Sequence, residues 1–417
     1  MNNWKLTKLE NYVDLISGFP FKSEFFTNNI EDIPLIKGDN LHQKFIDWET
    51  AKRWNKDDFD KLKKYQLEVD DIVLAMDRPW IEAGLKYAWI KESDPKCLLV
   101  QRITRLRGKN GLETNYLRYI IGSPSFTGYI KNTFTGVTIP HISPKQVLDY
   151  KFVLPPLKTQ QKIASILSAY DELIENNKQR IKLLEEMASE IYKEWFVRFR
   201  FPNYENTEFV DGLPLGWVEG KMGDIVEFKK GKNITFETVN EGNVPVVAGG
   251  LSPAYYHDTA NTISPTITIS ASGASAGFVN LYFENIWASD CSFVDRNATD
   301  SIYFIYNLLK NRQSEVYFLQ KGSAQPHVYP KDIMSLKLVK PINELIAKYE
   351  ALINPMFEEI KTLAQKNQTL QQTRDLLLPR LISGKLSLEG LTEKESNLLI
   401  KQEDTLLMAA EPSVAYS

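Results

Sequence analysis

The chain has 417 residues, enough for two or three domains with cores of their own, and its formal net charge is −3. Hydrophobic residues make up 43% of the sequence without any run of eighteen apolar residues, so we predict a globular protein with no membrane span. The N-terminus lacks an apolar signal core, which predicts a cytoplasmic location. The acidic balance argues against binding of nucleic acid through overall basicity, and we expect Cys97 and Cys291 to be small buried residues.

Residues 1–154 form the first predicted domain, in which short strand-like runs alternate with turns. Residues 69–77 and 98–108 are rich in β-branched and other apolar residues, which is typical of strands. Residues 114–123 predict a short helix, and the string KFVLP that begins at Lys151 predicts a last strand. This mixture indicates the α+β class.

Residues 155–200 predict one long central helix that takes part in a coiled coil. Apolar side chains recur at steps of three and four residues, which is the a/d pattern of a coiled coil rather than the wider apolar stripe of a core helix. Asn177 is a polar residue of the kind that fixes the register of such a pair, and an ordinary core helix is the alternative interpretation. The predicted contact positions are Ile163, Ile166, Tyr170, Leu173, Asn177, Ile181, Leu184, Met187 and Ile191.

Residues 201–340 form the second predicted domain and repeat the plan of the first. Strands are predicted at residues 218–228 and 243–248, and residues 265–279 form a β-rich run around a Gly/Ser/Ala turn. A helix is predicted at residues 301–311, in the place that residues 114–123 hold in the first domain. The second domain is therefore expected to share the α+β class.

Residues 341–385 predict a C-terminal coiled-coil helix that ends near Gly384. Pro355 lies inside the periodic run, where it removes a backbone hydrogen bond, so we expect a kink or break there. Residues 386–417 contain two basic and six acidic residues, which predicts a disordered acidic tail, with a short helix around residues 394–407 as the alternative. The predicted contact positions of the helix are Leu345, Tyr349, Leu352, Met356, Ile360, Leu363, Asn367, Leu370 and Leu377.

The two halves of the chain are copies of one another. Pro140-His141 matches Pro326-His327 at an offset of 186 residues (327 − 141), and the match continues without a gap through the long helices. The starts of the halves, Trp4 to Gly18 and Trp217 to Gly231, match at an offset of 213 (217 − 4). A period this long indicates a duplicated domain with pseudo-twofold symmetry rather than a solenoid.

No motif of a catalytic or metal site is convincing. The sequence lacks a P-loop, an HExxH motif and a GxSxG elbow, and its four histidines are isolated from one another. Asp211, Glu227 and Lys229 resemble the carboxylate set of metal-dependent nucleases, but Asp14 and Ile16 occupy the positions of Glu227 and Lys229 in the first half. We therefore predict no catalytic residue and no metal site in this chain.

The repeated loops around His141 and His327 are the candidate binding site. They present amides, hydroxyls and cations, the groups that contact base edges and phosphates in DNA. The alternative is an ordinary polar surface loop in which the two histidines cap or pack against the start of a helix. The DNA-binding candidates in these loops are Lys131, Asn132, Thr135, His141, Lys321, Ser323, Gln325 and His327. Further DNA-binding candidates from other loops are Lys22, Lys37, Arg78, Lys232, Ser270 and Ser272.

Two strings carry a resemblance to a known family. FVLPPLKTQQKIASILSAYDELIENNKQRIKLLEE, which begins at Phe152, resembles the central region of specificity (HsdS) subunits of type I restriction-modification enzymes. TLAQKNQTLQQTRDLLLPRLISGKLS, which begins at Thr362, resembles their C-terminal region. The resemblance covers the chain to about Leu388, although Lys340-Pro341-Ile342-Asn343 departs from the Pro-Pro-Leu form in the second copy.

The resemblance implies two α/β target recognition domains that are separated by two long antiparallel coiled-coil helices. Each domain would read one half of a split, asymmetric target in double-stranded DNA. The subunit would be non-catalytic and would hold two HsdM-type methyltransferase subunits and, in the full complex, HsdR-type restriction subunits. The chain would need no cofactor of its own, whereas the partners would use S-adenosylmethionine, ATP and Mg²⁺.

Two other functions are compatible with the sequence. A coiled-coil adaptor that joins two protein-binding domains would explain the net charge of −3 without any contact to DNA. A nuclease with a duplicated catalytic domain would require carboxylates at matched positions in the two halves, and the alignment shows none.

Overall fold

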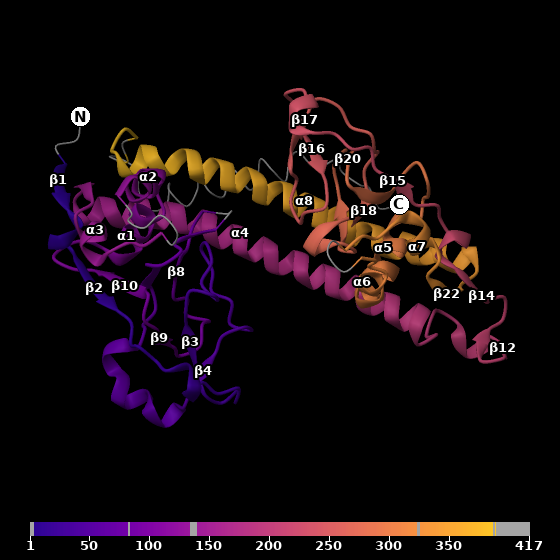
Figure 1. Ribbon diagram of the computed structural model, residues 1–417, viewed down its shortest axis with the longest axis horizontal. Helices are drawn as coiled ribbons and strands as arrows, with labels where there is room; N and C mark the ends of the chain where they lie inside the picture. The colour runs from indigo at the N-terminus through magenta and orange to yellow at the C-terminus, as the bar shows by residue number, and fades with distance from the viewer. Residues whose placement is uncertain (1–3, 82–83, 134–139, 323–325, 387, 389–417) are drawn as a thin grey trace. The chain divides into compact units, whose positions relative to one another are not determined.

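The computed structural model describes residues 4–81, 84–133, 140–322, 326–386 and 388 (Figure 1). The chain divides into two compact units. Unit 1 comprises residues 1–174 and 368–417, and unit 2 comprises residues 175–367. Each unit contains one of the predicted domains together with part of each long helix.

The main sheet of unit 1 has four antiparallel strands in the order β2–β10–β5–β8. A second sheet has the order β4–β3–β9, in which β3 and β9 are parallel, and β1 pairs with β11 so that the two ends of the domain meet. The strands are β1 Lys5–Lys8, β2 Val13–Ser17, β3 Ile33–Ile36, β4 Arg53–Trp54, β5 Ile72–Ala75, β6 Trp80–Ile81, β7 Gly84–Leu85, β8 Tyr87–Trp89, β9 Leu98–Leu99, β10 Ile103–Gly108 and β11 Lys151–Leu154.

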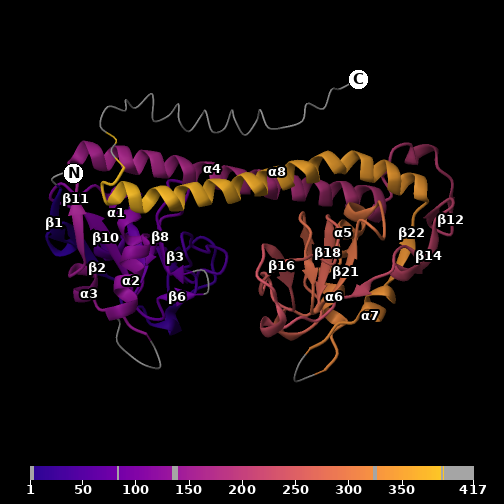
Figure 2. The same cartoon turned by 90° about the horizontal axis from the view of Figure 1, so that it is seen from above.

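The short helices of unit 1 begin at capping residues that the sequence supplies. The carboxylate of Glu113 accepts the backbone N–H of Tyr116 at 2.6 Å, and Ser143 and Gln146 form a capping box. The rings of Tyr116 and Phe126 are fully buried in the domain core. In Figure 2, helix α1 lies between the main sheet of this unit and the long helices. The helices are α1 Thr114–Ile121, α2 Pro124–Thr133 and α3 Pro144–Leu148.

Unit 2 repeats these pairings. Its main sheet has the order β15–β21–β18–β19, and its second sheet has the order β17–β16–β20 with β16 and β20 parallel. The strands are β12 Phe209–Val210, β13 Leu213–Pro214, β14 Val218–Lys221, β15 Lys229–Lys230, β16 Val244–Val247, β17 Tyr255–His257, β18 Thr266–Ser270, β19 Val279–Tyr282, β20 Trp287–Ala288, β21 Cys291–Asp295 and β22 Lys337–Lys340.

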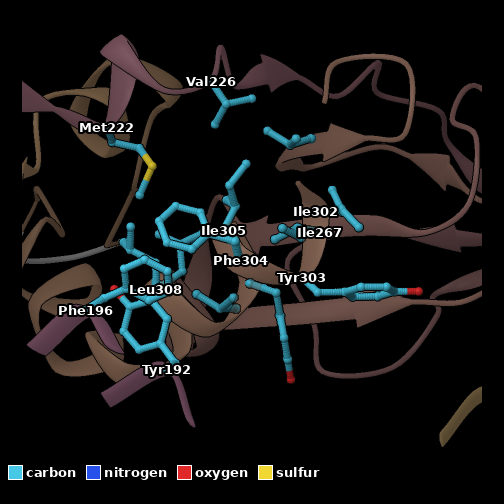
Figure 3. Packing of buried hydrophobic residues seen from close by; sticks show 14 of the residues in the cluster. Tyr192, Phe196, Met222, Val226, Ile267, Ile302, Tyr303, Phe304, Ile305 and Leu308 are labelled. Carbon is cyan, nitrogen blue, oxygen red and sulfur yellow. The ribbon is translucent and has the colours of Figure 1, made fainter. Parts of the chain in front are cut away.

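The core of unit 2 is rich in aromatic side chains, which come from helix α5 and the long helices. Figure 3 shows Tyr192 and Phe196 beside Phe304 and Leu308, and the rings of Phe196 and Phe304 meet edge to face at 4.9 Å. Pairs of this kind stabilise a core by about 0.5–1.5 kcal/mol beyond the burial of their area. The short helices of this unit are α5 Ile302–Asn311, α6 Gln313–Phe318 and α7 Pro330–Met334.

Glu350 makes the stability of unit 2 depend on pH. Its carboxylate accepts the backbone N–H groups of Tyr303 and Phe304 at 3.1 and 2.9 Å, at the start of α5. Burial raises the pKa of Glu350 to about 7, although the two N–H donors lower it. Because the pKa is raised in the folded state, its contribution to stability is complete below pH ~4.5 and is lost as the pH rises through about 7.

We expect the free energy of unfolding of the native chain to fall relative to that of Glu350→Gln by roughly 2–3 kcal/mol between pH 4.5 and 8. Urea unfolding at a series of pH values measures this difference. The matched control is Glu344→Gln, because Glu344 is exposed and pairs with Lys348 on the same helix. Equal pH profiles for the two variants would contradict the assignment to Glu350.

The duplication is preserved at the level of strand register. Lys5 pairs with Leu154 in unit 1, and Val218 pairs with Lys340 in unit 2, so the offsets of 213 and 186 residues both hold in one strand pair. The predicted α+β class and the internal repeat are confirmed. The predicted helices at residues 114–123 and 301–311 correspond to α1 and α5.

The two long helices are α4, Leu157–Tyr192, which continues into a π-helical turn over Lys193–Val197, and α8, Asn343–Ile382. They are antiparallel in each unit. In unit 2 the amide of Asn177 donates to Asn367 at 3.0 Å, and further along α4 the O of Ala188 accepts the hydroxyl of Tyr349 at 3.1 Å. In unit 1 Tyr170, Ile174 and Leu370 form a buried cluster. The predicted polar contact at Asn177 is therefore present.

Two predicted contact positions are wrong. Met187 is 52% exposed and Leu352 is 45% exposed, whereas their neighbours Ala188 and Ile353 are fully buried. A strict heptad repeat drifts by about 20° per heptad relative to a straight helix. The helices of unit 2 also pack against the domain core, which selects the neighbouring positions.

The predicted break at Pro355 is wrong as well, because α8 continues through this residue as one helix. Ile353 and Phe357, on either side of it, are buried in the core of unit 2. Their packing outweighs the roughly 3 kcal/mol that proline costs inside a helix. The helix ends at Ile382, and Gly384 has a φ of +70°, as expected for a residue that terminates a helix.

Cys97 and Cys291 are buried thiols, as predicted. No helix of the described residues is long and apolar enough to cross a membrane. Apart from Leu386 and Leu388, the acidic tail lies outside the described residues, as does its alternative short helix at residues 394–407.

Candidate nucleic-acid interface

In each unit, a histidine of the predicted loops pairs with a residue just beyond a central strand of the main sheet. His141 forms a β-bridge with Asp77, beyond β5, and His327 forms one with Ser272, beyond β18. The backbone hydrogen bonds that follow the histidines are equivalent too. They run from Ile142 N–H to Met76 O at 2.7 Å and from Val328 N–H to Ala271 O at 2.9 Å.

The residue that follows each bridge partner, Arg78 in unit 1 and Gly273 in unit 2, has a left-handed backbone conformation. Arg78 has a φ of +46° and donates its N–H to Pro140 O at 2.9 Å. Gly273 has a φ of +77° and donates its N–H to Pro326 O at 3.2 Å. The two histidine loops are thus built in the same way, although only unit 2 uses glycine at the position that favours it.

In unit 1 this site holds a carboxylate between two donors. Asp77 accepts a hydrogen bond from Nδ1 of His141 and forms an ion pair with Nε of Arg102 at 3.3 Å. The Arg102 side chain is 60% exposed and its φ is +79°. A non-glycine residue in this region costs about 1–2 kcal/mol, and such strain is concentrated at functional sites.

In unit 2 the same place holds a carboxylate and a hydroxyl. Ala271 donates its N–H to Asp290 O at 3.1 Å, just as Met76 donates to Arg102 O at 2.8 Å. Asp290 therefore occupies the position of Arg102. The hydroxyl of Ser272 donates to Oδ2 of Asp290. The two units present groups of opposite charge from equivalent backbone positions.

The loop of unit 2 also carries an aromatic ring and a lysine. The ring of His327 is stacked with that of Tyr329, with centroids 5.9 Å apart. Lys321 is exposed, and its ammonium group pairs with the buried carboxylate of Asp332 at 2.5 Å, which fixes the end of its side chain beside the loop. Stacked rings and cations on loops are suited to unpaired base faces and phosphates.

Two further predicted lysines lie over tryptophan rings. Nζ of Lys131, at the end of α2, is 6.0 Å from the ring centroid of Trp80, and Nζ of Lys232 is 5.8 Å from that of Trp287. Asn132 is exposed next to Lys131. These side chains are accessible to a polyanion.

The other predicted cations of unit 1 are partly engaged with acidic side chains. Lys37 pairs with Asp39 at 3.1 Å, and the exposed Lys22 lies 3.8 Å from Glu24. Exposed ion pairs contribute at most about 1 kcal/mol, so a phosphate can compete for either lysine.

The prediction for Ser270 is wrong. This residue belongs to β18, where it pairs with Cys291 of β21, and it is only 5% exposed. Thr135, Ser323 and Gln325 lie outside the described residues.

Lys86 adds to the positive charge near the loop of unit 1. Its Nζ donates to the backbone O of Gly38. Burial lowers the pKa of the Lys86 ammonium; Asp39 opposes this shift, and the nearby charge of Arg78 adds to it.

Sequence reasoning found the histidines but missed Asp77, Arg102 and Asp290. No motif marks these residues, because strand pairing brings them to the histidine loops. The internal repeat offered one signal. In a duplicated fold, Arg102 and Asp290, which directly precede β10 and β21, occupy equivalent positions, and their side chains have opposite charges.

Among the described residues, no group of three or more histidine, cysteine or acidic side chains could hold a metal ion. The fold and the site define a duplicated recognition protein, with one polar loop site per unit and a long helix following each domain.

The chain belongs to the family of type I restriction-modification DNA specificity proteins. The family model described as "Type I restriction modification DNA specificity domain" matches residues 1–186 and 214–371, one match per half. The predicted family is thereby confirmed, and with it the assignment of the chain as a non-catalytic specificity subunit.

Curated relatives support the same family. The type I restriction enzyme MjaIX specificity subunit of Methanocaldococcus jannaschii is 29% identical over 308 residues, covering 68% of this chain and 71% of the relative. The EcoAI specificity subunit of Escherichia coli is 32% identical over 173 residues, covering 41% of this chain and 28% of the relative. The crystal structure of a type I restriction-modification S subunit from M. genitalium has the same fold, with a TM-score of 0.57, 18% identity and coverage of 91% and 96%.

Proposed function

We propose that this chain is the sequence-reading subunit of a type I restriction-modification complex and that its two units contact the two halves of a split, asymmetric DNA target. The observation that carries the proposal is the repeated histidine loop. The β-bridge of each histidine and the backbone hydrogen bonds beside it are equivalent in both units, while the side chains at equivalent positions differ in charge. Two loops with equivalent backbone pairing but different side chains would give the chain two recognition sites that prefer different bases on one duplex.

The chain also acts as a scaffold in this proposal. It would hold two HsdM-type methyltransferase subunits and, in the full complex, HsdR-type restriction subunits. S-adenosylmethionine, ATP and Mg²⁺ would be bound by those partners. The family membership and the exposed polar faces of the long helices support this role.

The test is methylome sequencing of cells that express the chain with its neighbouring methyltransferase subunit. We expect N6-methyladenine in both halves of a split motif, and we expect the methylation to disappear when the chain is deleted. A contiguous motif, or an active methyltransferase without any motif that depends on the chain, would favour the adaptor alternative. Cleavage or methylation of DNA by the purified chain alone would favour the nuclease alternative.

A further inference from the structure

Arg102 lies in the turn between Val100 and Ile103, in which Ile103 donates its N–H to Val100 O at 3.1 Å. It is a non-glycine residue with a φ of +79° directly before β10, and among the described residues its exposed side chain has one carboxylate partner, Asp77. A positive φ at the third residue is what a turn of this type requires. The turn fixes the direction in which the Arg102 side chain leaves the end of the sheet.

The guanidinium of Arg102 is oriented for bidentate binding. Asp77 contacts its Nε at 3.3 Å, and the second oxygen of the carboxylate is held by His141. Within the described residues, the terminal nitrogens Nη1 and Nη2 have no hydrogen-bond acceptor. Two parallel N–H donors match the O6 and N7 acceptors that guanine presents in the major groove. Fixing the side chain beforehand reduces the entropy lost on binding.

The residues around Arg102 suit it to a position on DNA. The exposed Arg78 flanks Asp77 on the chain, and Lys131 lies over the ring of Trp80 beyond it. Cations at the edge of such a site can bind phosphates, which set the register of the domain on the duplex. The base-reading donor and the phosphate-binding cations would then come from one end of one sheet.

In unit 2 the equivalent position carries the opposite hydrogen-bonding character. Oδ2 of Asp290 accepts the hydroxyl of Ser272, which orients the carboxylate. Within the described residues, Oδ1 accepts no hydrogen bond. A carboxylate oxygen can accept the N4 amino group of cytosine, whereas it repels the O6 and N7 acceptors of guanine.

We propose that Arg102 recognises a guanine in one half of the target and that Asp290 recognises the amino group of a cytosine in the other half. The inference rests on the proposed function and adds the residues that determine specificity at one base pair of each half. Asp77, His141 and Ser272 are positioning residues, because each acts on the base through Arg102 or Asp290.

The experiment uses the full chain with its methyltransferase subunit and compares methylomes of single variants. In Arg102→Ala, the requirement for one guanine in one half of the motif should fall by roughly tenfold to a hundredfold, while the other half stays unchanged. Arg102→Gln should change the preference at the same position from guanine to adenine, since glutamine binds N6 and N7 of adenine. A changed preference cannot arise from misfolding.

Asp290→Asn provides the independent test in unit 2. We expect the cytosine requirement to be replaced by a preference for adenine in the other half of the motif. Lys145→Ala is the control, because Lys145 is an exposed residue of unit 1 whose ammonium group pairs with Asp149. It should leave every position of the motif unchanged.

Two results would overturn the inference. One is an unchanged motif in the Arg102 and Asp290 variants. The other is a uniform decrease of methylation over all sequences, which would identify these residues as phosphate contacts or structural residues. A native chain that yields no split motif would instead overturn the proposed function, so the two failures can be distinguished.

Discussion

Replacement of Asp171 by alanine should lower the free energy of unfolding of unit 1 by roughly 3–5 kcal/mol. Asp171, on α4, lies at the centre of a buried charged cluster. Its Oδ1 is 2.6 Å from Nη1 of Arg374, on α8, and its Oδ2 accepts the hydroxyl of Tyr119 at 2.8 Å. Arg118 lies 3.9 Å away, so Asp171 is shared by two buried guanidinium groups, of which Arg374 also pairs with the exposed Asp375 at 2.9 Å.

The large effect follows from what the substitution leaves behind. Arg118 and Arg374 are both nearly buried, and loss of Asp171 would leave Arg118 without this carboxylate and Arg374 with the exposed Asp375 as its carboxylate partner. The rings of Trp89 and Tyr119 contact the Arg118 guanidinium at 4.2 and 4.7 Å but carry no charge to compensate it. Burying an unpaired charge costs far more than losing an exposed ion pair.

Urea unfolding of the full chain measures the effect, and hydrogen exchange of the α1 amides assigns it to unit 1. The matched control is Glu359→Ala, since Glu359 forms a half-exposed ion pair with Arg180 between the same two helices at 2.6 Å. This control should change stability by less than about 1 kcal/mol. Equal effects of the two substitutions would show that the Asp171 cluster contributes no more than a surface pair.

The charged cluster illustrates a limit of prediction from the sequence. The offset of 186 residues places Phe357 at the position of Asp171 in the second copy, and the ring of Phe357 is stacked on Tyr303 at 4.2 Å. The repeat predicts the backbone positions of both residues correctly. It cannot predict that one copy uses ions and the other aromatic rings, because either set can fill the same space between a domain and its helices.

The periodicity of the long helices predicted their extent but not every contact. Asn177 faces Asn367 as expected, because two amide side chains on facing helices can satisfy each other's hydrogen bonds. Met187 and Leu352 are exposed because packing against the domain, rather than the partner helix alone, determines which face is buried. Contacts of this kind depend on residues that are distant in sequence.

The candidate site was predictable only where the signal is local. The proline-histidine strings placed His141 and His327 at equivalent bridges, because the loops are fixed by short-range backbone bonds. Ser270 was assigned to a loop although it belongs to a strand. Arg102 was missed because the feature that distinguishes it is its positive φ angle, which the sequence does not reveal. Neither strand boundaries nor left-handed conformations of arginine can be read from composition.

Glycine at positions 18 and 231 explains a further part of the repeat. Each donates its N–H across the main sheet, Gly18 to Ile103 O at 3.0 Å and Gly231 to Cys291 O at 2.8 Å. A Cβ on Gly18 would lie 2.6 Å from Leu99 O, and one on Gly231 would lie 2.8 Å from Ala288 O, with further backbone atoms closer still. The repeat therefore keeps glycine because two backbones approach each other closely, not because of a special φ angle.

Gly18→Ala and Gly231→Ala should each destabilise the unit that contains them by roughly 2–3 kcal/mol, because the overlap is with backbone that cannot rotate away. Gly38→Ala is the matched control: a Cβ there meets no atom within 4 Å, so the substitution should be neutral or stabilise unit 1 by about 0.4–1 kcal/mol. Thermal and urea unfolding of the three variants measure the effects. If Gly18→Ala and Gly38→Ala change stability equally, close backbone approach is not what selects glycine; opposite signs would show that the duplicated sheets are constrained at the same point in both units.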